Sequence, residues 1–279
     1  MVYLVESLWE TREEKYQPRC NTLIPVDLQG KSGIVFGVAN NRSIAWAIAQ
    51  VLHEAGVSLA ITYQNERLYE RVSKLAEGYD RITLLECDVS DDQHIADVFS
   101  QAQQRLDNIS FVIHSIAYAN REDLDGEFSK TSRQGFQTAL EVSAYSLLPI
   151  ARYAAPLMEQ GGSIVTLTFE ASERVYPGYN IMGTAKAALE NEVRQLAYEL
   201  GEKNIRVNAI SAGPLETLAA RGIHGFLDMR RIHAERSPLR RNITLEEVAK
   251  VALFLCSDLS SGITGTTIPV DAGYHIMGV

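Results

Sequence analysis

The run GIVFGVANNRSIAWAIAQVLHEAG, residues 33–56, determines the fold of this chain. An apolar stretch comes first, the polar turn ANNRS follows, and a segment of helical periodicity continues to Gly56. A strand that is apolar on both faces and leads directly into a helix is typical of a parallel sheet covered on both sides. In such folds a dinucleotide phosphate binds at the turn after the first strand, where free helix amides face the ligand.

The same alternation of apolar runs and helical segments continues along the chain. The expected strands are 33–38, 57–63, 82–87, 109–115, 163–168, 205–210 and 266–270. The expected helices are 43–56, 66–77, 91–106, 131–158, 179–201 and 244–255. We therefore predict one Rossmann-like α/β domain, a doubly wound parallel sheet of about seven strands with helices on both faces. This dinucleotide-binding catalytic domain would span residues 26–279, after an N-terminal extension, residues 1–25, whose role the sequence does not reveal.

Composition narrows the classes of function. The chain has 279 residues, 46% of them apolar, which is enough for one large core. Its formal charge of 26 minus 35, or −9, argues against nucleic-acid binding, which needs clustered Lys and Arg. No run of about 18 uncharged apolar residues could cross a bilayer, and the acidic N-terminus resembles neither a signal nor a transit peptide. The dispersed Cys20, Cys87 and Cys256 indicate a reducing, cytoplasmic compartment, and the scattered histidines imply no metal site.

A tyrosine and a lysine seven residues apart are the leading catalytic candidates. Tyr179 and Lys186 lie in the run PGYNIMGTAK, residues 177–186. Seven helical residues make almost two turns and advance about 10.5 Å, so both side chains would project from one face toward one ligand. A phenol is a useful acid where negative charge develops on an oxygen, and a neighbouring ammonium favours the phenolate. The alternative is an ordinary surface helix that happens to carry both residues.

Residues at the expected strand ends are candidates for binding a dinucleotide. Gly37 allows close backbone approach, and Ser43 can cap the next helix or bond a phosphate, although G-x-G-x-x-G is absent. Gln64 could bond a ribose 2′-hydroxyl, or Arg67 could accept a 2′-phosphate, which leaves both NADH and NADPH open. Asp88 could accept a hydrogen bond from an adenine amine or cap the following helix.

Taken in order, these motifs resemble one family over about residues 28–278. They are Gly37 with SIA at 43–45, TYQN at 62–65, DV at 88–89, HSI at 114–116, YNIMGTAK at 179–186, VNAISAGP at 207–214 and VDAGYHIMG at 270–278. The chain is similar to the bacterial NADH-dependent enoyl-acyl-carrier-protein reductases, a divergent branch of the short-chain dehydrogenase/reductases. The wider superfamily usually spaces its tyrosine and lysine by four residues, and the spacing of seven is typical of this branch.

The resemblance implies a reaction and a set of site residues. Hydride would pass from NADH to the β-carbon of a trans-2-enoyl thioester on an acyl carrier protein, in fatty acid biosynthesis. Tyr179 would donate a hydrogen bond to the thioester oxygen, while Lys186 would bind the nicotinamide ribose and lower the pKa of the phenol. Ala119 would border the substrate, and the subunits would form a homotetramer through their long helices. The residues that would line the cofactor are Gly37, Ser43, Ile44, Gln64, Asp88, Val89, Ser115, Ile116, Lys186, Leu215, Thr217 and Ala219.

Two departures from the family pattern concern the substrate site. Phe169 stands where many relatives have a second tyrosine, ten residues before Tyr179, and we expect its ring to pack against the substrate and gate it. Glu216 stands where the family often has a basic residue, and Glu170 adds another acid. These changes leave the acyl-chain preference open.

A long segment, residues 214–238, follows the sixth expected strand. Its small and apolar residues predict a cover over the substrate, although a helix pair on the sheet edge is the alternative. Six arginines in 221–241 stand against Asp228 and Glu235, a local charge of 6 minus 2, or +4, that could dock an acidic carrier protein or be a solvated face. Two other functions stay open at this point: a short-chain dehydrogenase acting on a carbonyl or alcohol, and a catalytically weak dinucleotide-binding module.

Overall fold

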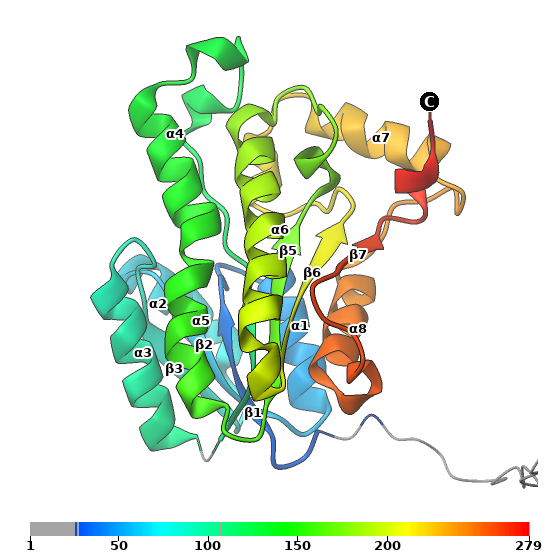
Figure 1. Ribbon diagram of the computed structural model, residues 1–279. Helices are drawn as coiled ribbons and strands as arrows, with labels where there is room; N and C mark the ends of the chain where they lie inside the picture. The colour runs from blue at the N-terminus through cyan, green and yellow to red at the C-terminus, as the bar shows by residue number, and fades with distance from the viewer. Residues whose placement is uncertain (1–25, 27, 107, 279) are drawn as a thin grey trace, which may run out of the picture.

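A seven-stranded parallel sheet in the order β3-β2-β1-β4-β5-β6-β7 forms the centre of the molecule (Figure 1). The computed structural model describes residues 26, 28–106 and 108–278, apart from the side chains of residues 219 and 221, so the predicted extension 1–25 lies outside it. The strands are β1 (Ser32–Phe36), β2 (Ser58–Tyr63), β3 (Ile82–Glu86), β4 (Ile109–His114), β5 (Gly162–Thr168), β6 (Ile205–Ala212) and β7 (Thr267–Val270). The predicted Rossmann-like doubly wound sheet is confirmed, with strand ends within two residues of those expected.

Strand order reverses between β1 and β4. The chain runs outward from β1 through β2 to β3, then returns to β4 and continues on the other side to β7. The helices are α1 (Ile44–Glu54), α2 (Glu66–Ala76), α3 (Asp92–Arg105), α4 (Arg133–Leu140), α5 (Leu147–Ala154), α6 (Asn180–Leu200), α7 (Phe226–Arg236) and α8 (Leu245–Cys256). Because the connections diverge between β1 and β4, a crevice opens at the carboxyl ends of these strands, where such sheets bind ligands.

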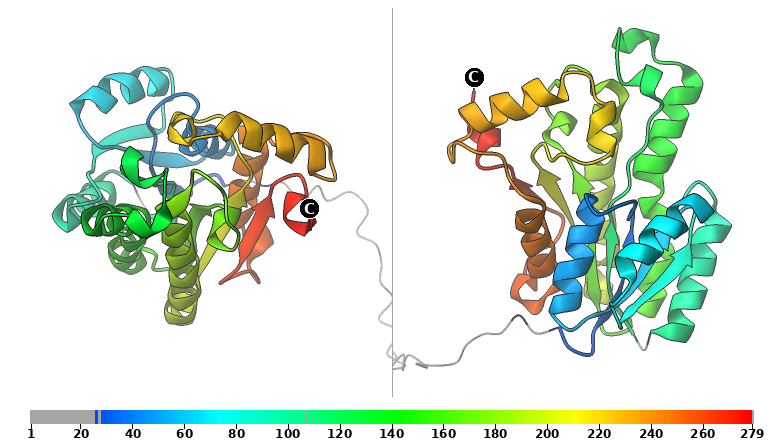
Figure 2. Two further views of the ribbon diagram at one scale, coloured as in Figure 1. Left: turned by 90° about the horizontal axis from the view of Figure 1, so that it is seen from above. Right: turned by 180° about the vertical axis from the view of Figure 1, so that it is seen from behind.

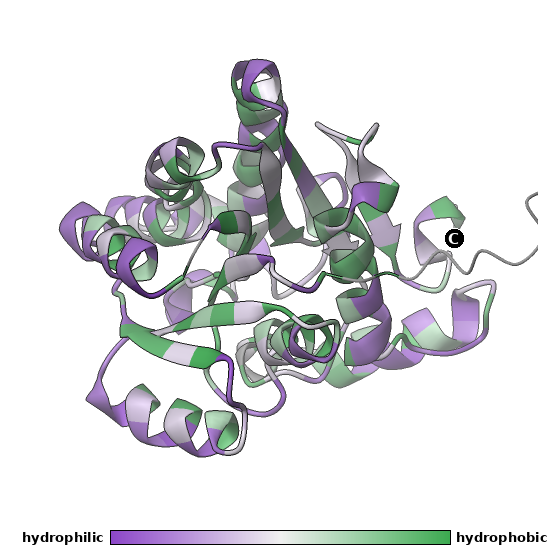
Figure 3. Cartoon of the chain, turned by 90° about the horizontal axis from the view of Figure 1, so that it is seen from below, coloured by the Kyte–Doolittle hydropathy of each residue, from purple (hydrophilic) through white to green (hydrophobic). Residues whose placement is uncertain are grey.

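Two apolar layers hold the helices on the sheet. On one face α3, α5 and α6 pack against strand residues such as Ile34 and Val112, and this face is toward the viewer in Figure 1. On the other face α1, α2 and α8 pack against residues such as Val35 and Ile113, as the right-hand view of Figure 2 shows. Because neighbouring strand residues point to opposite faces, the double burial explains the continuous apolar runs of the sequence. In Figure 3 the strands are largely hydrophobic and the outer sides of the helices hydrophilic.

The single helix predicted at 131–158 is wrong. A π-helical turn, η3 (Glu141–Tyr145), separates α4 from α5. The Ser146 amide donates to the carbonyl five residues back at 3.1 Å, and its hydroxyl donates to the Val142 carbonyl at 2.7 Å. Pro149, in the first turn of α5, has no N–H to continue the regular ladder. Turns of this kind are frequent at functional sites, and η3 borders the cavity described below.

Above the carboxyl edge of the sheet lies the predicted covering segment, 214–238, which contains the short 3₁₀ helix η7 (Ala219–Gly222) and α7 (Figures 1 and 2). The sequence offered helices here only as the alternative to a cover, because α7 buries few side chains, Phe226 and His233, and so lacks a continuous apolar stripe. Within the described residues, no helix has the length and apolar character needed to span a membrane.

Candidate active site

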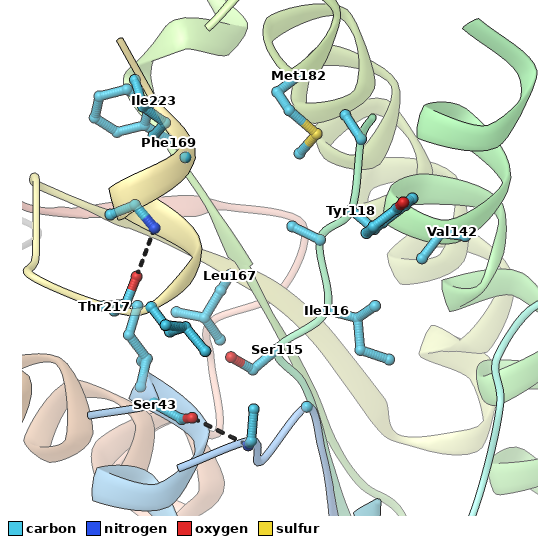
Figure 4. A pocket seen from close by; sticks show the side chains of 18 of the residues that line it. Ser43, Ser115, Ile116, Tyr118, Val142, Leu167, Phe169, Met182, Thr217 and Ile223 are labelled. Carbon is cyan, nitrogen blue, oxygen red and sulfur yellow. Dashed lines mark hydrogen bonds between the residues drawn. The ribbon is translucent and has the colours of Figure 1, made fainter. Parts of the chain in front are cut away.

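A cavity of about 1090 Å³ opens at the carboxyl ends of the strands, above the crevice between β1 and β4 (Figure 4). Almost all predicted site residues line it. They are Gly37, Ser43, Ile44, Gln64, Asp88, Val89, Ser115, Ile116, Ala119, Phe169, Tyr179, Lys186, Leu215 and Thr217. Ala219, also predicted, begins η7, and its side chain lies outside the description. Residues from the ends of six strands therefore line one cavity.

Gly37 and Ser43 shape the turn after β1. Gly37 has a φ of 98°, and a Cβ at this position would lie 2.0 Å from the Ser115 carbonyl oxygen. Glycine is therefore needed for the chain after β1 to approach the end of β4. The Ser43 hydroxyl accepts hydrogen bonds from the Ala39 and Asn40 amides at 3.1 and 3.0 Å, and Figure 4 draws one of the two. Ser43 occupies the N-cap position of α1 without a side-chain bond to the helix, so its predicted capping role is wrong, and its hydroxyl instead holds the turn.

Gln64 and Asp88 meet beside the ends of β2 and β3. The Gln64 amide donates to Asp88 Oδ2 at 3.1 Å, and the amide and hydroxyl of Ser90 donate to Oδ1 at 3.0 and 2.8 Å. Burial alone would raise the pKa of Asp88, but the hydrogen bonds from Ser90 and Gln64 bring it below its usual value. Asp88 does not cap α3, because Asp91 does. Arg67, the alternative contact for a 2′-phosphate, does not line the cavity.

Tyr179 and Lys186 both line the cavity, as the spacing of seven predicted. Tyr179 is the N-cap of α6, and the first helical residue, Asn180, has a φ of 28°, so the pair begins with an irregular turn. Lys186 is 4% exposed, and its ammonium donates to the Leu167 carbonyl at 2.7 Å. Burial lowers the pKa of Lys186 to about 8, and the nearby Glu190 carboxylate acts in the opposite direction. The lysine is thus a buried cation held at the end of β5.

The phenol of Tyr179 behaves differently from what was expected. Burial raises its pKa above the ordinary value of 10.0. The predicted lowering of this pKa by Lys186 is therefore wrong for this structure, because the ammonium bonds the Leu167 carbonyl and the apolar surroundings of the phenol dominate. The Phe169 ring is one of these surroundings, edge-on to Tyr179 at 5.1 Å between centroids. At neutral pH the phenol keeps its proton, which is the form that donates a hydrogen bond.

Much of the remaining cavity wall is apolar. Figure 4 shows Tyr118, Val142 and Met182 on one wall, whereas Phe226 and Met229 line the cavity from α7. The serine in the middle of η3, residue 143, holds the first wall, because its hydroxyl accepts from the Tyr118 amide at 2.9 Å and donates to the Tyr118 carbonyl at 3.0 Å. Sequence reasoning missed Tyr118 and Val142, since nothing in the sequence indicates the π-helical turn that brings this serine to Tyr118.

The covering segment is tied together by its own side chains. The Ala220 amide donates to the Thr217 hydroxyl at 3.2 Å, a bond drawn in Figure 4. Glu216, one of the departures from the family pattern, pairs with Arg230 of α7 at 3.0 Å. The acid at this position therefore links the start of the segment to its helix.

His114, the last residue of β4, lies fully buried beneath the cavity. Its ring nitrogens are 2.8 Å from the Thr166 hydroxyl and 2.9 Å from the Ser146 hydroxyl, which joins β4 to β5 and to the start of α5. Burial, with a smaller contribution from the charge of Lys186, lowers the pKa of His114 to about 3. The imidazole is therefore neutral in the native protein.

We expect acid to destabilise the fold through His114. Its native pKa of about 3 lies below the ordinary 6.5, so between these values the unfolded chain binds a proton that the native chain does not. The free energy of unfolding should fall as the pH drops from 6.5 toward 3, by about 2 to 3 kcal/mol at pH 4.5. Urea unfolding at pH 7 and pH 4.5 measures this loss. Between these two pH values the free energy of unfolding of His114→Gln should fall by about 2 to 3 kcal/mol less than that of the wild type. Identical losses in both proteins would contradict the assignment.

In the part of the chain that the structure describes, no group of three or more His, Cys, Asp or Glu side chains could hold a metal ion.

Comparison with known sequences places this site in a family. The family model described as enoyl-(acyl carrier protein) reductase matches residues 37–275. An enoyl-acyl-carrier-protein reductase (NADH) of Nostoc sp. is 50% identical over 257 residues, which cover 91% of this chain and 100% of the relative. The protein of the same name from Bacillus cereus is 52% identical over 254 residues, covering 90% of this chain and 99% of the relative.

Solved structures are similar over the same range. The enoyl-acyl carrier protein reductase of Bacillus cereus, in complex with NADP+ and indole naphthyridinone, has a TM-score of 0.88 and 51% identity, over 90% of this chain and 99% of that one. The reductase of Anaplasma phagocytophilum, in complex with NAD, has a TM-score of 0.87 and 44% identity, over 90% of this chain and 96% of that one.

Proposed function

The chain belongs to the enoyl-(acyl carrier protein) reductase family, and we propose a role for each of its site residues in the reaction. The enzyme reduces the trans-2 double bond of enoyl-acyl-carrier-protein thioesters with NADH, in fatty acid biosynthesis. The assignment of residues rests on one observation: Tyr179 and Lys186 line the same cavity as the strand-end residues expected to bind a dinucleotide. The turn that begins at Gly37 leads into the N-terminus of α1, where free backbone amides would attract a pyrophosphate.

The reaction needs a donor where charge develops. NADH, when bound, supplies the hydride that reaches the β-carbon of the thioester. Tyr179 keeps its proton and donates a hydrogen bond to the thioester oxygen as negative charge appears there, so the bond strengthens toward the transition state. Lys186 donates to the Leu167 carbonyl with one N–H of its ammonium, and the other two would be available to bind the ribose hydroxyls of the cofactor. Phe169 packs edge-on against the Tyr179 ring and lines the cavity. Because Phe169 has no hydroxyl, Tyr179 is the phenol that stabilises the enolate oxygen, and the enolate then takes up a proton from water at its α-carbon.

The end of β2 supports NADH over NADPH. Gln64 is positioned there by its bond to Asp88, and its free amide oxygen can accept from a ribose 2′-hydroxyl. A 2′-phosphate at this place would approach the Asp88 carboxylate, and Arg67 does not line the cavity to offset the repulsion. Steady-state kinetics with both cofactors test this assignment, because a lower KM for NADPH than for NADH would overturn it.

A direct assay tests the function. Mixing the protein with NADH and crotonyl or longer enoyl thioesters should deplete the near-ultraviolet absorbance of NADH. Oxidation of alcohols without turnover of enoyl thioesters would instead support a short-chain dehydrogenase, and cofactor binding without any turnover would support a binding module. The seven-residue spacing of Tyr179 and Lys186 and the family membership both favour enoyl reduction.

For the carrier protein, we propose docking on the exposed arginines of α7. The expected +4 is reduced in the structure, because Glu216 pairs with Arg230 and Glu247 pairs with Arg241 at 2.6 Å. Arg231 and Arg236 are exposed on α7, which borders the cavity through Phe226 and Met229. Arg231 also pairs within the helix, with Glu235 at 3.0 Å and Asp228 at 3.5 Å. An acidic carrier delivering its acyl group would be steered to this side.

Charge reversal tests the docking proposal. The double variant Arg231→Glu, Arg236→Glu should raise KM for a carrier-linked enoyl thioester about fivefold at low salt and leave KM for a coenzyme A thioester unchanged. Arg105→Glu, at the C-terminal end of α3, is the matched control and should change neither. Equal effects on the two substrates would remove the proposal.

The proposal also covers the oligomeric state of the enzyme and its location in the cell. The enzyme acts as a homotetramer in the cytoplasm. Tyr145 of η3 and Tyr198 of α6 are 41% and 88% exposed, which supports pairing of these long helical segments between subunits. Cys87 and Cys256 are free and buried, which supports a reducing compartment. Light scattering after size-exclusion chromatography tests the tetramer.

A further inference from the structure

Three polar side chains from separate segments meet behind Phe169. The Tyr176 hydroxyl donates to Glu170 Oε2, and His233 Nε2 lies 3.3 Å from the same hydroxyl oxygen. Glu170 begins η5 (Glu170–Ser172) directly after Phe169, Tyr176 lies in the loop before α6, and His233 belongs to α7. The three side chains therefore connect the loop that carries the catalytic tyrosine with the helix that covers the cavity.

The hydrogen-bond roles in this cluster follow from its burial. Burial and the bond to Glu170 raise the pKa of Tyr176, so the phenol keeps its proton and donates a hydrogen bond to the carboxylate. The hydroxyl oxygen must then accept from His233, which puts the ring proton on Nε2. Burial lowers the pKa of His233 to about 4, although Asp271 acts in the opposite direction, so the ring is neutral at pH 7. One tautomer of His233 thus serves as a fixed donor.

Aromatic contacts continue the cluster on both sides. The Tyr176 ring lies 4.6 Å from Phe169, which is itself 5.1 Å from Tyr179. On the other side His233 stacks on Tyr274, with 3.6 Å between centroids and 17° between planes. A row of five rings therefore runs from the catalytic phenol through α7 to the C-terminal segment.

Arg174 fastens the cluster to that C-terminal segment. Its Nε pairs with Glu170 Oε1 at 3.0 Å, while its terminal nitrogens donate to the Met277 and His275 carbonyls at 2.9 and 2.8 Å. The two oxygens of Glu170 are thus divided between Tyr176 and Arg174. The Arg174 charge lies beside one oxygen of the carboxylate, while the other oxygen accepts the hydrogen bond from Tyr176.

We propose that Glu170, Tyr176 and His233 form a latch that holds α7 against the acyl site and thereby strengthens the binding of long-chain substrates. This proposal rests on the proposed function. None of the three latch residues lines the cavity, so they are positioning residues that act through Phe169 and through Phe226 and Met229, which line it from α7. A long acyl chain gains affinity by burying methylene groups against α7, and a four-carbon chain is too short to gain it.

The variant Tyr176→Phe tests the latch, because it removes the hydroxyl and both its hydrogen bonds but keeps the ring. We expect KM for dodecenoyl thioester to rise about fivefold to tenfold, while KM for crotonyl thioester and both kcat values stay within about twofold. Tyr79→Phe is the matched control, since it deletes a partly buried hydroxyl that accepts from Gln50 at 2.9 Å and does not line the cavity. Equal changes of KM at both chain lengths, or a fall in kcat, would overturn the proposal.

Two further measurements separate the latch from a loss of folding and from the proposed function. His233→Gln keeps a side-chain N–H donor and should behave like the wild type, whereas His233→Phe should behave like Tyr176→Phe. Hydrogen exchange without substrate should be faster in α7 of Tyr176→Phe than in the wild type and unchanged in α8. Unchanged hydrogen exchange in α7 would overturn the latch proposal, independently of which substrate the enzyme reduces. A wild-type protein that does not reduce enoyl thioesters would overturn the proposed function but not the contact between the latch and α7.

Discussion

Replacing Tyr179 with Phe should lower kcat for enoyl thioester reduction by about 10²- to 10³-fold, the usual effect of removing one preorganised donor from a developing oxyanion. Burial keeps the phenol protonated, so the wild-type enzyme presents the proton before the hydride arrives. The variant keeps the ring and its edge-on contact with Phe169. The variant should therefore have a lower kcat, while the geometry of the site stays unchanged.

Depletion of NADH with saturating crotonyl thioester measures this effect. Binding of NADH, followed by its fluorescence, should stay within about twofold of the wild type, because the phenol is not required to hold the cofactor. Phe169→Leu is a useful companion, since it removes the ring that supports Tyr179 and should cost less in kcat than the loss of the hydroxyl itself. A decrease in kcat of less than about threefold for Tyr179→Phe would mean that another group stabilises the charge.

Replacing Gly37 with Ala should be the most damaging single-methyl change in the cofactor half of the site. The added Cβ would lie 2.0 Å from the Ser115 carbonyl oxygen. The backbone fixes the positions of both atoms, so no rotamer change can separate them. The φ of 98° adds strain of its own. We expect a loss of about 3 kcal/mol or more in the free energy of unfolding, together with at least tenfold weaker binding of NADH.

Gly78 supplies a matched control for this change. It also has a positive φ, 87°, but a Cβ there would meet nothing within 4 Å. Gly78→Ala should therefore show only the conformational cost, about 1 to 2 kcal/mol, and leave NADH binding unchanged. Urea unfolding and NADH titration of both variants measure the difference. If the two variants lost equal stability and both bound NADH normally, the close approach at Gly37 would have no role.

The parts of this enzyme that the sequence predicts are those set by local pattern. The run 33–56 shows strand, turn and helix because both faces of β1 are buried and α1 has an apolar stripe. The spacing of Tyr179 and Lys186 predicts a shared face because helical geometry is regular over short distances. These two patterns, with the order of the motifs, are enough for the fold, the cavity and the family.

The parts that the sequence did not predict depend on contacts between distant segments. The raised pKa of Tyr179 reflects the apolar wall around it, and the bond between Lys186 and the Leu167 carbonyl needs β5 and α6 side by side. The bond between Tyr176 and His233 joins a loop to a helix that lacks an apolar stripe. No local rule of periodicity or capping contains these neighbours.

The strand order also governs when a growing polypeptide can first hold its cofactor. β1 pairs with β4, matching Ile34 with Val112, and the residues proposed to bind the cofactor extend as far along the chain as Thr217. A nascent chain leaving the ribosome must therefore wait for most of its length before the nucleotide can add to its stability. Until then, truncated products gain no protection from proteases by binding it.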